Sequence, residues 1–105
     1  MQAFEVDGLE AARSAASERY HEFLRRDSMS AGLYVVRARE NDPQTPHNQD
    51  ELYYVVSGVG RIRVGTQDRP VGAGSIVFVE AGIEHRFHSI TRDLTVLVVF
   101  APPEE

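Results

Sequence analysis

Apolar residues recur at intervals of three and four positions near the start of the chain. Within residues 9–26 this spacing joins Leu9, Ala12, Ala16, Tyr20, Phe23 and Leu24, while charged side chains occupy the opposite face. Such a period is that of an amphipathic helix. Asp7 and Glu10 also stand at the spacing of a capping box. The pattern therefore predicts one helix over residues 9–26.

Beyond Gly32 the pattern changes to short segments with strand-like alternation, separated by turn residues. The predicted strands span residues 33–39, 51–57, 61–64, 69–71, 75–79, 85–90 and 94–100. Short strands at regular spacing with glycine-rich turns are typical of an all-β sandwich or barrel. We therefore predict a single domain in which residues 32–105 form a β-barrel. Residues 1–31 form a helical extension that packs on it, and residues 102–105 are expected to be frayed.

Two of the predicted strands, residues 75–79 and 94–100, are apolar on both faces. A strand in a small barrel normally buries one face only. The outer faces of these strands therefore need a cover, which the N-terminal helix, a second subunit or both would supply. On this ground we predict a homodimer.

The composition excludes several classes of function. The 105 residues carry a formal net charge of −5, which argues against a nucleic-acid partner because phosphate binding needs a basic surface. All 11 basic side chains are arginine, so a Schiff-base mechanism on a lysine is excluded. The chain has no cysteine, which excludes disulfides, thiolate ligands and cysteine nucleophiles.

The chain offers no sign of a membrane partner. No apolar segment approaches the about 20 residues that a membrane span requires. The first residues lack the basic start and apolar core of a signal peptide. We therefore expect a cytoplasmic protein.

The strongest chemical signal comes from two histidines and a carboxylate. His47 and Glu51 stand just before and at the start of one predicted strand, and His85 stands at the start of another. Side chains alternate across a strand, so His47, Gln49 and Glu51 can share one face. Two imidazoles and a carboxylate on a concave wall suit a divalent transition metal, with positions left for water or substrate. The sequence therefore predicts a metal site formed by His47, Glu51 and His85.

The spacing of these residues resembles the cupin superfamily of double-stranded β-helix proteins, and in particular its small bacterial single-domain members with a conserved type-2 barrel. His47, Glu51 and Gly58 match the second half of the family's first motif. The glycines and histidine of the second motif are matched by Gly74, Gly82 and His85. The resemblance covers about residues 32–101. It implies an all-β jelly-roll barrel, to which the N-terminal helix is added.

The chain departs from the family pattern at three positions. Thr45 stands where the family has its first histidine, which reduces the usual set of three histidines and one glutamate. Gln49 is the candidate fourth ligand, through an amide oxygen that is a weaker ligand for a transition metal. Glu80 replaces a proline and Ser89 an asparagine, and we expect no loss of fold from either.

The implied function is that of a small metal-binding protein, with Fe(II) favoured and Mn, Ni or Zn as alternatives. One hypothesis is a non-haem oxygenase acting on a small organic substrate. Tyr53 falls on the inward phase with Glu51, and its hydroxyl makes it the candidate catalytic residue. A non-catalytic module that binds a small molecule remains open. So does a Zn-, Ni- or Mn-dependent isomerase, cyclase or lyase.

Overall fold

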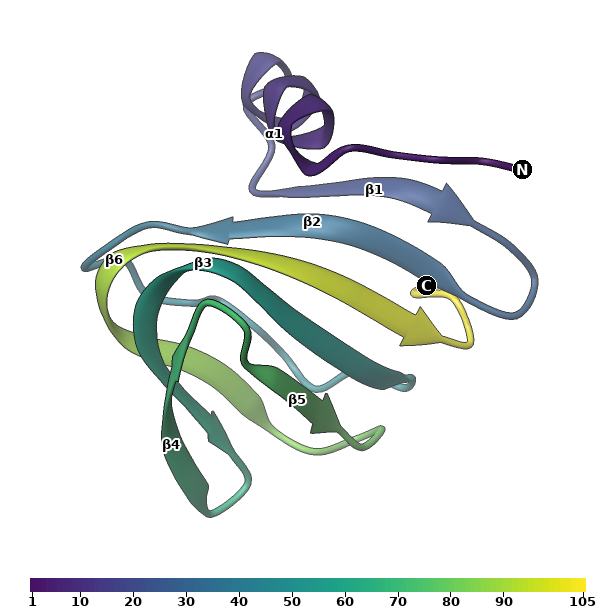
Figure 1. Cartoon of the computed structure of the whole chain (residues 1–105). Helices are drawn as coiled ribbons and strands as arrows, with labels where there is room; N and C mark the ends of the chain where they lie inside the picture. Colours follow the sequence, from purple (N-terminus) through teal and green to yellow (C-terminus); the bar gives the residue numbers. More distant parts are fainter.

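Strands make up most of the molecule, and a single helix stands at one side of them (Figure 1). The computed structural model describes residues 1–105. The elements in chain order are α1 (Val6–Ala15), β1 (Tyr20–Arg25), β2 (Ser30–Val36), β3 (Asp50–Val64), β4 (Gln67–Gly72), β5 (Ile76–Val79) and β6 (His85–Ala101). The predicted all-β class with one N-terminal helix is confirmed. The helix is neither long nor apolar enough to cross a membrane.

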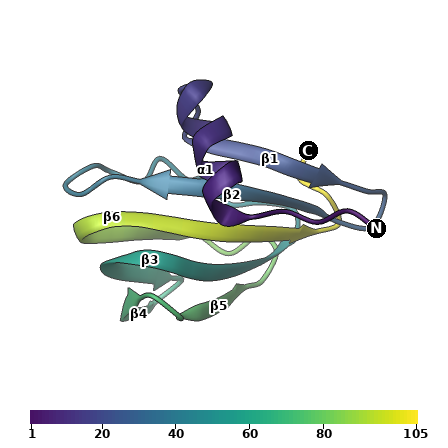
Figure 2. The same ribbon diagram turned by 45° about the horizontal axis from the view of Figure 1, so that its top comes forward.

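The strands pair antiparallel within one curled sheet. Their order is β1-β2-β6-β3-β4, and β5 pairs with the first part of β3. The longest ladder joins β3 to β6 and runs from the Asp50–Ala101 pair to the Val64–His85 pair. Figures 1 and 2 show that β4 and β5 lie on the other side of this ladder from β1 and β2. The sheet folds back on itself and encloses a core.

The bend in the β3–β6 ladder depends on Gly58. A Cβ at this position would lie 2.3 Å from the backbone oxygen of Asp93, so no larger residue fits without moving the backbone. The ladder continues through the bend with irregular register between Val55 and Arg61. For this reason the strands predicted as residues 51–57 and 61–64 form one element. The same holds for residues 85–90 and 94–100 in β6.

The predicted helix over residues 9–26 is wrong in its second half. The helix ends at Ala15, and residues Tyr20–Arg25 form β1, which pairs with β2. A segment of six residues is too short for its apolar spacing to distinguish a helix from a strand. The edge of β2 offers backbone hydrogen-bond partners to a neighbouring strand, so the segment pairs with it. The capping box is also wrong, because Glu5 is the cap residue without a side-chain hydrogen bond, and Glu10 forms an ion pair within the helix.

Alternation along β3 decides which side chains enter the core. Glu51, Tyr53 and Val55 are buried, while Leu52 and Tyr54 are exposed. The inner face of β6 joins this core through Phe87, Ile90, Leu94, Val96, Val98 and Phe100. A carboxylate therefore enters the apolar interior in the same phase as its core neighbours.

The opposite face of β3 and β5 is apolar and exposed. Leu52, Tyr54, Ile76 and Phe78 keep 43%, 42%, 64% and 60% of their surfaces accessible. Strand pairing sets Leu52 beside Phe78 and Tyr54 beside Ile76, so the four form one surface, here called the outer patch. The helix packs instead on β1 and β2, at the other end of the strand order.

Candidate metal centre

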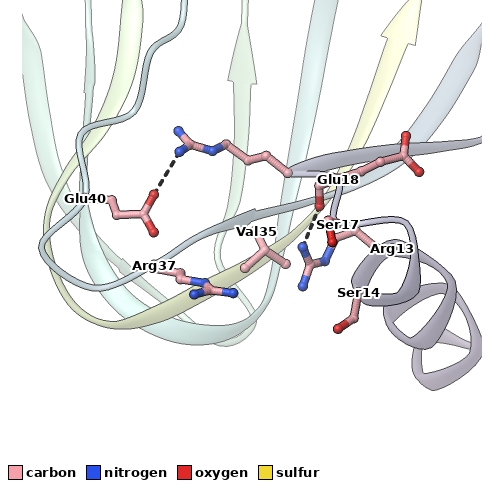
Figure 3. A pocket seen from close by; sticks show the side chains of 8 residues that line it. Arg13, Ser14, Ser17, Glu18, Val35, Arg37 and Glu40 are labelled. Carbon is pink, nitrogen blue, oxygen red and sulfur yellow. Dashed lines mark hydrogen bonds and ion pairs between the residues drawn. The ribbon is translucent and has the colours of Figure 1, made fainter.

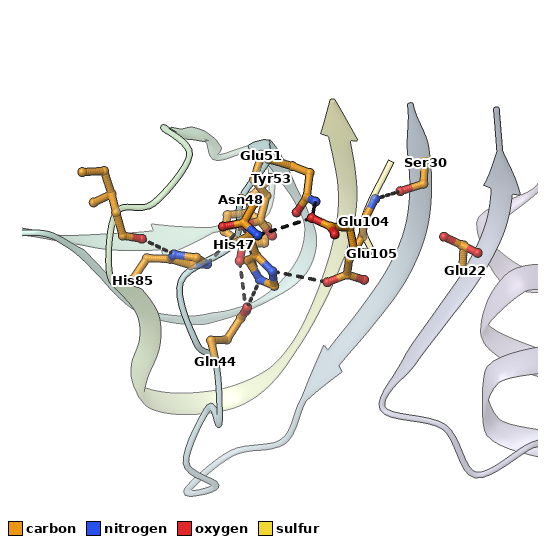
Figure 4. Close-up of polar contacts among 12 residues, drawn as sticks. Glu22, Ser30, Gln44, His47, Asn48, Glu51, Tyr53, His85, Glu104 and Glu105 are labelled. Atoms are coloured by element: carbon orange, nitrogen blue, oxygen red, sulfur yellow. Dashed lines mark hydrogen bonds and ion pairs between the residues drawn. The ribbon is translucent and has the colours of Figure 1, made fainter. Parts of the chain in front are cut away.

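The three predicted metal-binding residues meet inside the barrel (Figure 4). Glu51 and His85 stand near opposite ends of the β3–β6 ladder, but the curl of the ladder brings Glu51 Oε1 to 3.1 Å from His85 Nε2. His47, in the segment before β3, places its Nε2 4.0 Å from the same oxygen. One donor atom from each residue lies within 4.8 Å of the other two.

The turn between β5 and β6 fixes His47 relative to His85. Gly82 donates its backbone N–H to the carbonyl oxygen of His47 at 2.6 Å, and Ala81 donates to Asp50 Oδ1 at 2.9 Å. Gly82 has a φ of +81°, a conformation that favours glycine. The second-motif glycine thus holds the segment that carries the first-motif histidine.

The donor set fits a divalent cation. Glu51 Oε1 and His85 Nε2 are fully buried, yet neither has a hydrogen-bond partner, because their 3.1 Å contact lacks hydrogen-bond geometry. Buried polar atoms without partners are costly, and a cation between them would satisfy both. Bonds to zinc from such ligands are about 2.0–2.2 Å long, so two atoms 3.1 Å apart are close enough to bind one cation together.

His85 presents the correct nitrogen to this point. Its Nδ1 lies 2.8 Å from the carbonyl oxygen of Ile83, which can only accept, so the neutral ring carries its proton on Nδ1 and its lone pair on Nε2. Burial alone lowers the pKa of His85. The Glu51 carboxylate and the Ile83 carbonyl outweigh it and raise the pKa overall.

His47 has a partner at each nitrogen. Its Nδ1 lies 3.4 Å from Glu104 Oε2, and its Nε2 lies 3.1 Å from Gln44 Oε1. Gln44 in turn donates from Nε2 to the hydroxyl of Tyr53 at 2.9 Å. Neither Gln44 nor Glu104 was predicted from the sequence as part of the site. Gln44 lies in a segment without periodic pattern, and Glu104 lies in the stretch that was expected to fray.

Gln49 has different hydrogen-bond partners from Gln44. Gln49 is buried, as its predicted phase requires, and its amide nitrogen donates to Glu105 Oε1 at 3.2 Å. Its assignment as a fourth ligand stays a prediction. Thr45, at the position of the family's first histidine, lines the cavity beside the centre.

This cavity has a volume of about 240 Å³ and reaches His47 and Glu51. Three tyrosines line it, of which Tyr53 is fully buried and Tyr20 has a buried hydroxyl without a hydrogen-bond partner. Burial raises the pKa of Tyr53 well above its ordinary value. Tyr53 therefore lies where the sequence placed it, on the wall of a cavity next to the candidate centre.

A second hollow of about 240 Å³ lies beside α1 (Figure 3). Two of its three arginines have partners within the chain, since Arg13 donates to the backbone oxygen of Glu18 at 2.6 Å and Arg19 pairs with Glu40 at 2.8 Å. It contains none of the predicted metal-binding residues. We therefore place the candidate site in the barrel.

The sequence model of the cupin domain family matches residues 32–100, which include both motifs. The chain belongs to the cupin family. This confirms the resemblance read from the motifs, and with it the jelly-roll form of the barrel.

Three known proteins illustrate how the cupin compares with others. It is 53% identical over 104 residues to an uncharacterized protein of Streptomyces coelicolor, covering 99% of both chains. A cupin of Methanocaldococcus jannaschii with a double-stranded β-helix fold superposes with a TM-score of 0.71 at 19% identity, over 79% of this chain and 78% of that one. The DMSP lyase DddQ of Ruegeria pomeroyi gives 0.70 at 22% identity, over 84% of this chain and 49% of the lyase. At such identities the two structures show a common fold alone.

Proposed function

We propose that this cupin binds one divalent transition metal through His47, Glu51 and His85 and acts as a non-haem oxygenase on a small organic substrate in the adjoining cavity. The observation that carries the proposal is the pair of buried, unpartnered atoms, Glu51 Oε1 and His85 Nε2. Two histidines and one carboxylate with free coordination positions suit Fe(II), and Mn, Ni or Zn fit the same donors.

The residues around the centre have separate tasks in this proposal. When bound, Fe(II) would supply the positions at which dioxygen and a chelating substrate meet. Tyr53 and Gln44, hydrogen-bonded to each other at 2.9 Å, stand where they can orient a substrate or hold a proton beside it. Gln49 is the proposed fourth ligand. The substrate class is a small diketone, enediol or phenolic compound.

An isomerase, cyclase or lyase that uses Zn, Ni or Mn is the second candidate function. The fully buried Tyr53 favours it, because its raised pKa keeps the phenol protonated, and a protonated phenol can donate a hydrogen bond to a substrate oxygen without a redox partner. A module that binds a small molecule without catalysis would need the same cavity but not this tyrosine.

Metal analysis of protein purified without an affinity tag tests the common part of these proposals. We expect about one transition metal ion per chain, and its loss in His85→Ala. Full occupancy of the variant would contradict the ligand set. Oxygen uptake by the Fe(II)-loaded protein over diketones and catechols then separates the oxygenase from the other functions. Uptake that does not depend on substrate would count against it.

We also propose that the outer patch joins two copies of the chain into a homodimer. Its four apolar side chains form one continuous exposed surface on β3 and β5. Soluble proteins rarely leave such a surface open unless it binds a partner. Size-exclusion chromatography with light scattering at low micromolar concentration should show a species of twice the 11.7 kDa chain mass. A species of single mass alone would contradict the proposal.

A further inference from the structure

We infer that Glu104 is a positioning residue of the metal centre, which receives the Nδ1–H of His47 and so leaves Nε2 free to face Glu51 and His85. The inference rests on the proposed metal site. Its starting observation is the 3.4 Å ion-pair contact between Glu104 Oε2 and His47 Nδ1, which lies on the side of the ring away from the site and is longer than a well-formed hydrogen bond.

Both histidines of the centre would then have a hydrogen-bond acceptor beside Nδ1. A neutral imidazole carries one proton, and an acceptor beside one nitrogen leaves the other nitrogen free for a metal. For His85 that acceptor is the backbone oxygen of Ile83, 2.8 Å from Nδ1. His47 lies in an irregular segment and has the carboxylate of Glu104 in the equivalent place. A carboxylate also makes the ring a stronger donor to a metal.

Gln44 makes this acceptor necessary. Its Oε1 lies 3.1 Å from His47 Nε2 and accepts a hydrogen bond whenever that nitrogen carries the proton. With the proton on Nε2, His47 would hydrogen-bond to Gln44 and could not bind a metal through the same atom. The carboxylate near Nδ1 competes for the proton, because a hydrogen bond to a charged acceptor is stronger than one to an amide oxygen, and a small side-chain shift would close the 3.4 Å gap. Glu104 therefore selects the tautomer that the site needs.

Glu104 is fixed in place by contacts on both sides of it (Figure 4). Its backbone N–H donates to Ser30 Oγ at 3.0 Å, and Ser30 is fully buried on β2. The neighbouring Glu105 carboxylate accepts from the side-chain amides of Asn48 and Gln49 at 3.3 and 3.2 Å. Residues 102–105 thus bind the segment that carries His47, so the expectation that they fray is wrong.

Burial distinguishes this pair from an ordinary surface ion pair. The side chains of His47 and Glu104 are 18% and 29% exposed, and Glu104 lines the cavity. Residues 102–105 lie beyond the segment that the cupin family model matches. Glu104 is therefore not one of the residues that the family motifs mark.

Three variants test the inference: Glu104→Ala, Glu104→Gln and, as a control, Glu40→Gln, which alters an acidic residue that pairs with Arg19. The first readout is Zn(II) affinity by calorimetry or competition with a chromophoric chelator. We expect Glu104→Ala to weaken binding about 10- to 100-fold, the usual effect of removing such a partner of a ligating histidine. Glu104→Gln retains an uncharged acceptor and should recover part of the loss, and Glu40→Gln should bind as the wild type does.

The second readout is the tautomer of His47, measured by ¹⁵N NMR of the imidazole in metal-free protein above pH 8. We expect a protonated Nδ1 in the wild type and a shift toward a protonated Nε2 in Glu104→Ala. Because no metal is needed, this result stands even if the wild type binds none, which would refute only the proposed function. An unchanged tautomer in a folded Glu104→Ala variant would overturn the inference. Ser30→Ala loosens the segment without removing the carboxylate, so it should have a smaller effect on both readouts.

Discussion

The backbone N–H of Gly82 lies 2.6 Å from the carbonyl oxygen of His47, so the turn that leads into β6 holds the segment that leads into β3. This contact joins the two sequence motifs of the family directly. It explains in part why a glycine is needed in the second motif for the histidine of the first to be in place.

Gly82→Ala should therefore lower both stability and metal affinity. A Cβ at Gly82 meets nothing within 4 Å, so the cost is that of a left-handed backbone, about 1–2 kcal/mol. Gly74→Ala is a matched control, since Gly74 also has a positive φ and open space around it but does not contact His47. Urea unfolding should show similar losses for both variants, whereas Zn(II) titration should show weaker binding for Gly82→Ala alone. Equal metal affinities would contradict a role for this turn in the site.

Asp42→Asn should destabilise the fold by about 1–3 kcal/mol. The buried Asp42 carboxylate accepts from the Tyr34 hydroxyl through Oδ1 and from the backbone N–H of Phe87 through Oδ2 at 2.8 Å. An asparagine offers one acceptor oxygen in place of two, so one buried donor loses its partner. Chemical denaturation at neutral pH measures the difference, and an unchanged midpoint would contradict the structural role of this carboxylate.

The cost of Asp42→Asn should fall as the pH rises. Burial raises the pKa of Asp42 above its usual 3.8 and outweighs the hydrogen bonds from Tyr34 and Phe87, which lower it. The folded state therefore binds more protons than the unfolded state between these two pKa values. The stability that this group contributes is present below pH 3.8 and is lost as the pH rises through the folded pKa. Unfolding free energies of both proteins from pH 4 to pH 7 test the sign, and a cost that grows with pH would refute it.

Gln49→Ala should weaken Zn(II) binding about tenfold or more if Gln49 supplies the fourth ligand. Gln44→Ala should leave the affinity unchanged or raise it, because Gln44 competes for the proton of His47 Nε2. Calorimetric titration of the two variants ranks them directly. The reverse ranking would assign the amide ligand to Gln44.

Phe78→Glu should convert the proposed dimer into a monomer with little change in the fold. Phe78 belongs to the outer patch and is 60% exposed, so a charge there disturbs an interface more than it disturbs the core. Val6→Glu on the helix, 37% exposed, is the control. Light scattering should show half the mass for Phe78→Glu only. A dimer that survives the substitution would place the interface elsewhere.

The inward residues of β3 could be predicted from the sequence because alternation leaves little choice. Once Glu51 points into the barrel, Tyr53 and Val55 must follow, and the structure shows all three buried. The motif glycines were also informative, because Gly58 and Gly82 both have a positive φ, a backbone conformation that favours glycine. Local rules therefore yielded the strands from β2 onward and the three candidate ligands.

What the sequence did not reveal depends on contacts between distant segments. Tyr20 fits a helical period as well as a strand, and only pairing with β2 decides between them. Gln44 and Glu104 approach His47 from an irregular segment and from the stretch after β6. No periodicity marks such residues, since their positions follow from the closed barrel and not from their neighbours in sequence.

The meeting of Glu51 with His85 has a mechanical consequence. These residues stand near opposite ends of the β3–β6 ladder, and a cation bound by both would link the two ends of the curled ladder. Metal content would then set how far the mouth of the barrel opens. Amide hydrogen exchange should slow at both ends of the ladder together on loading with Zn(II), even though those ends are far apart along the strands.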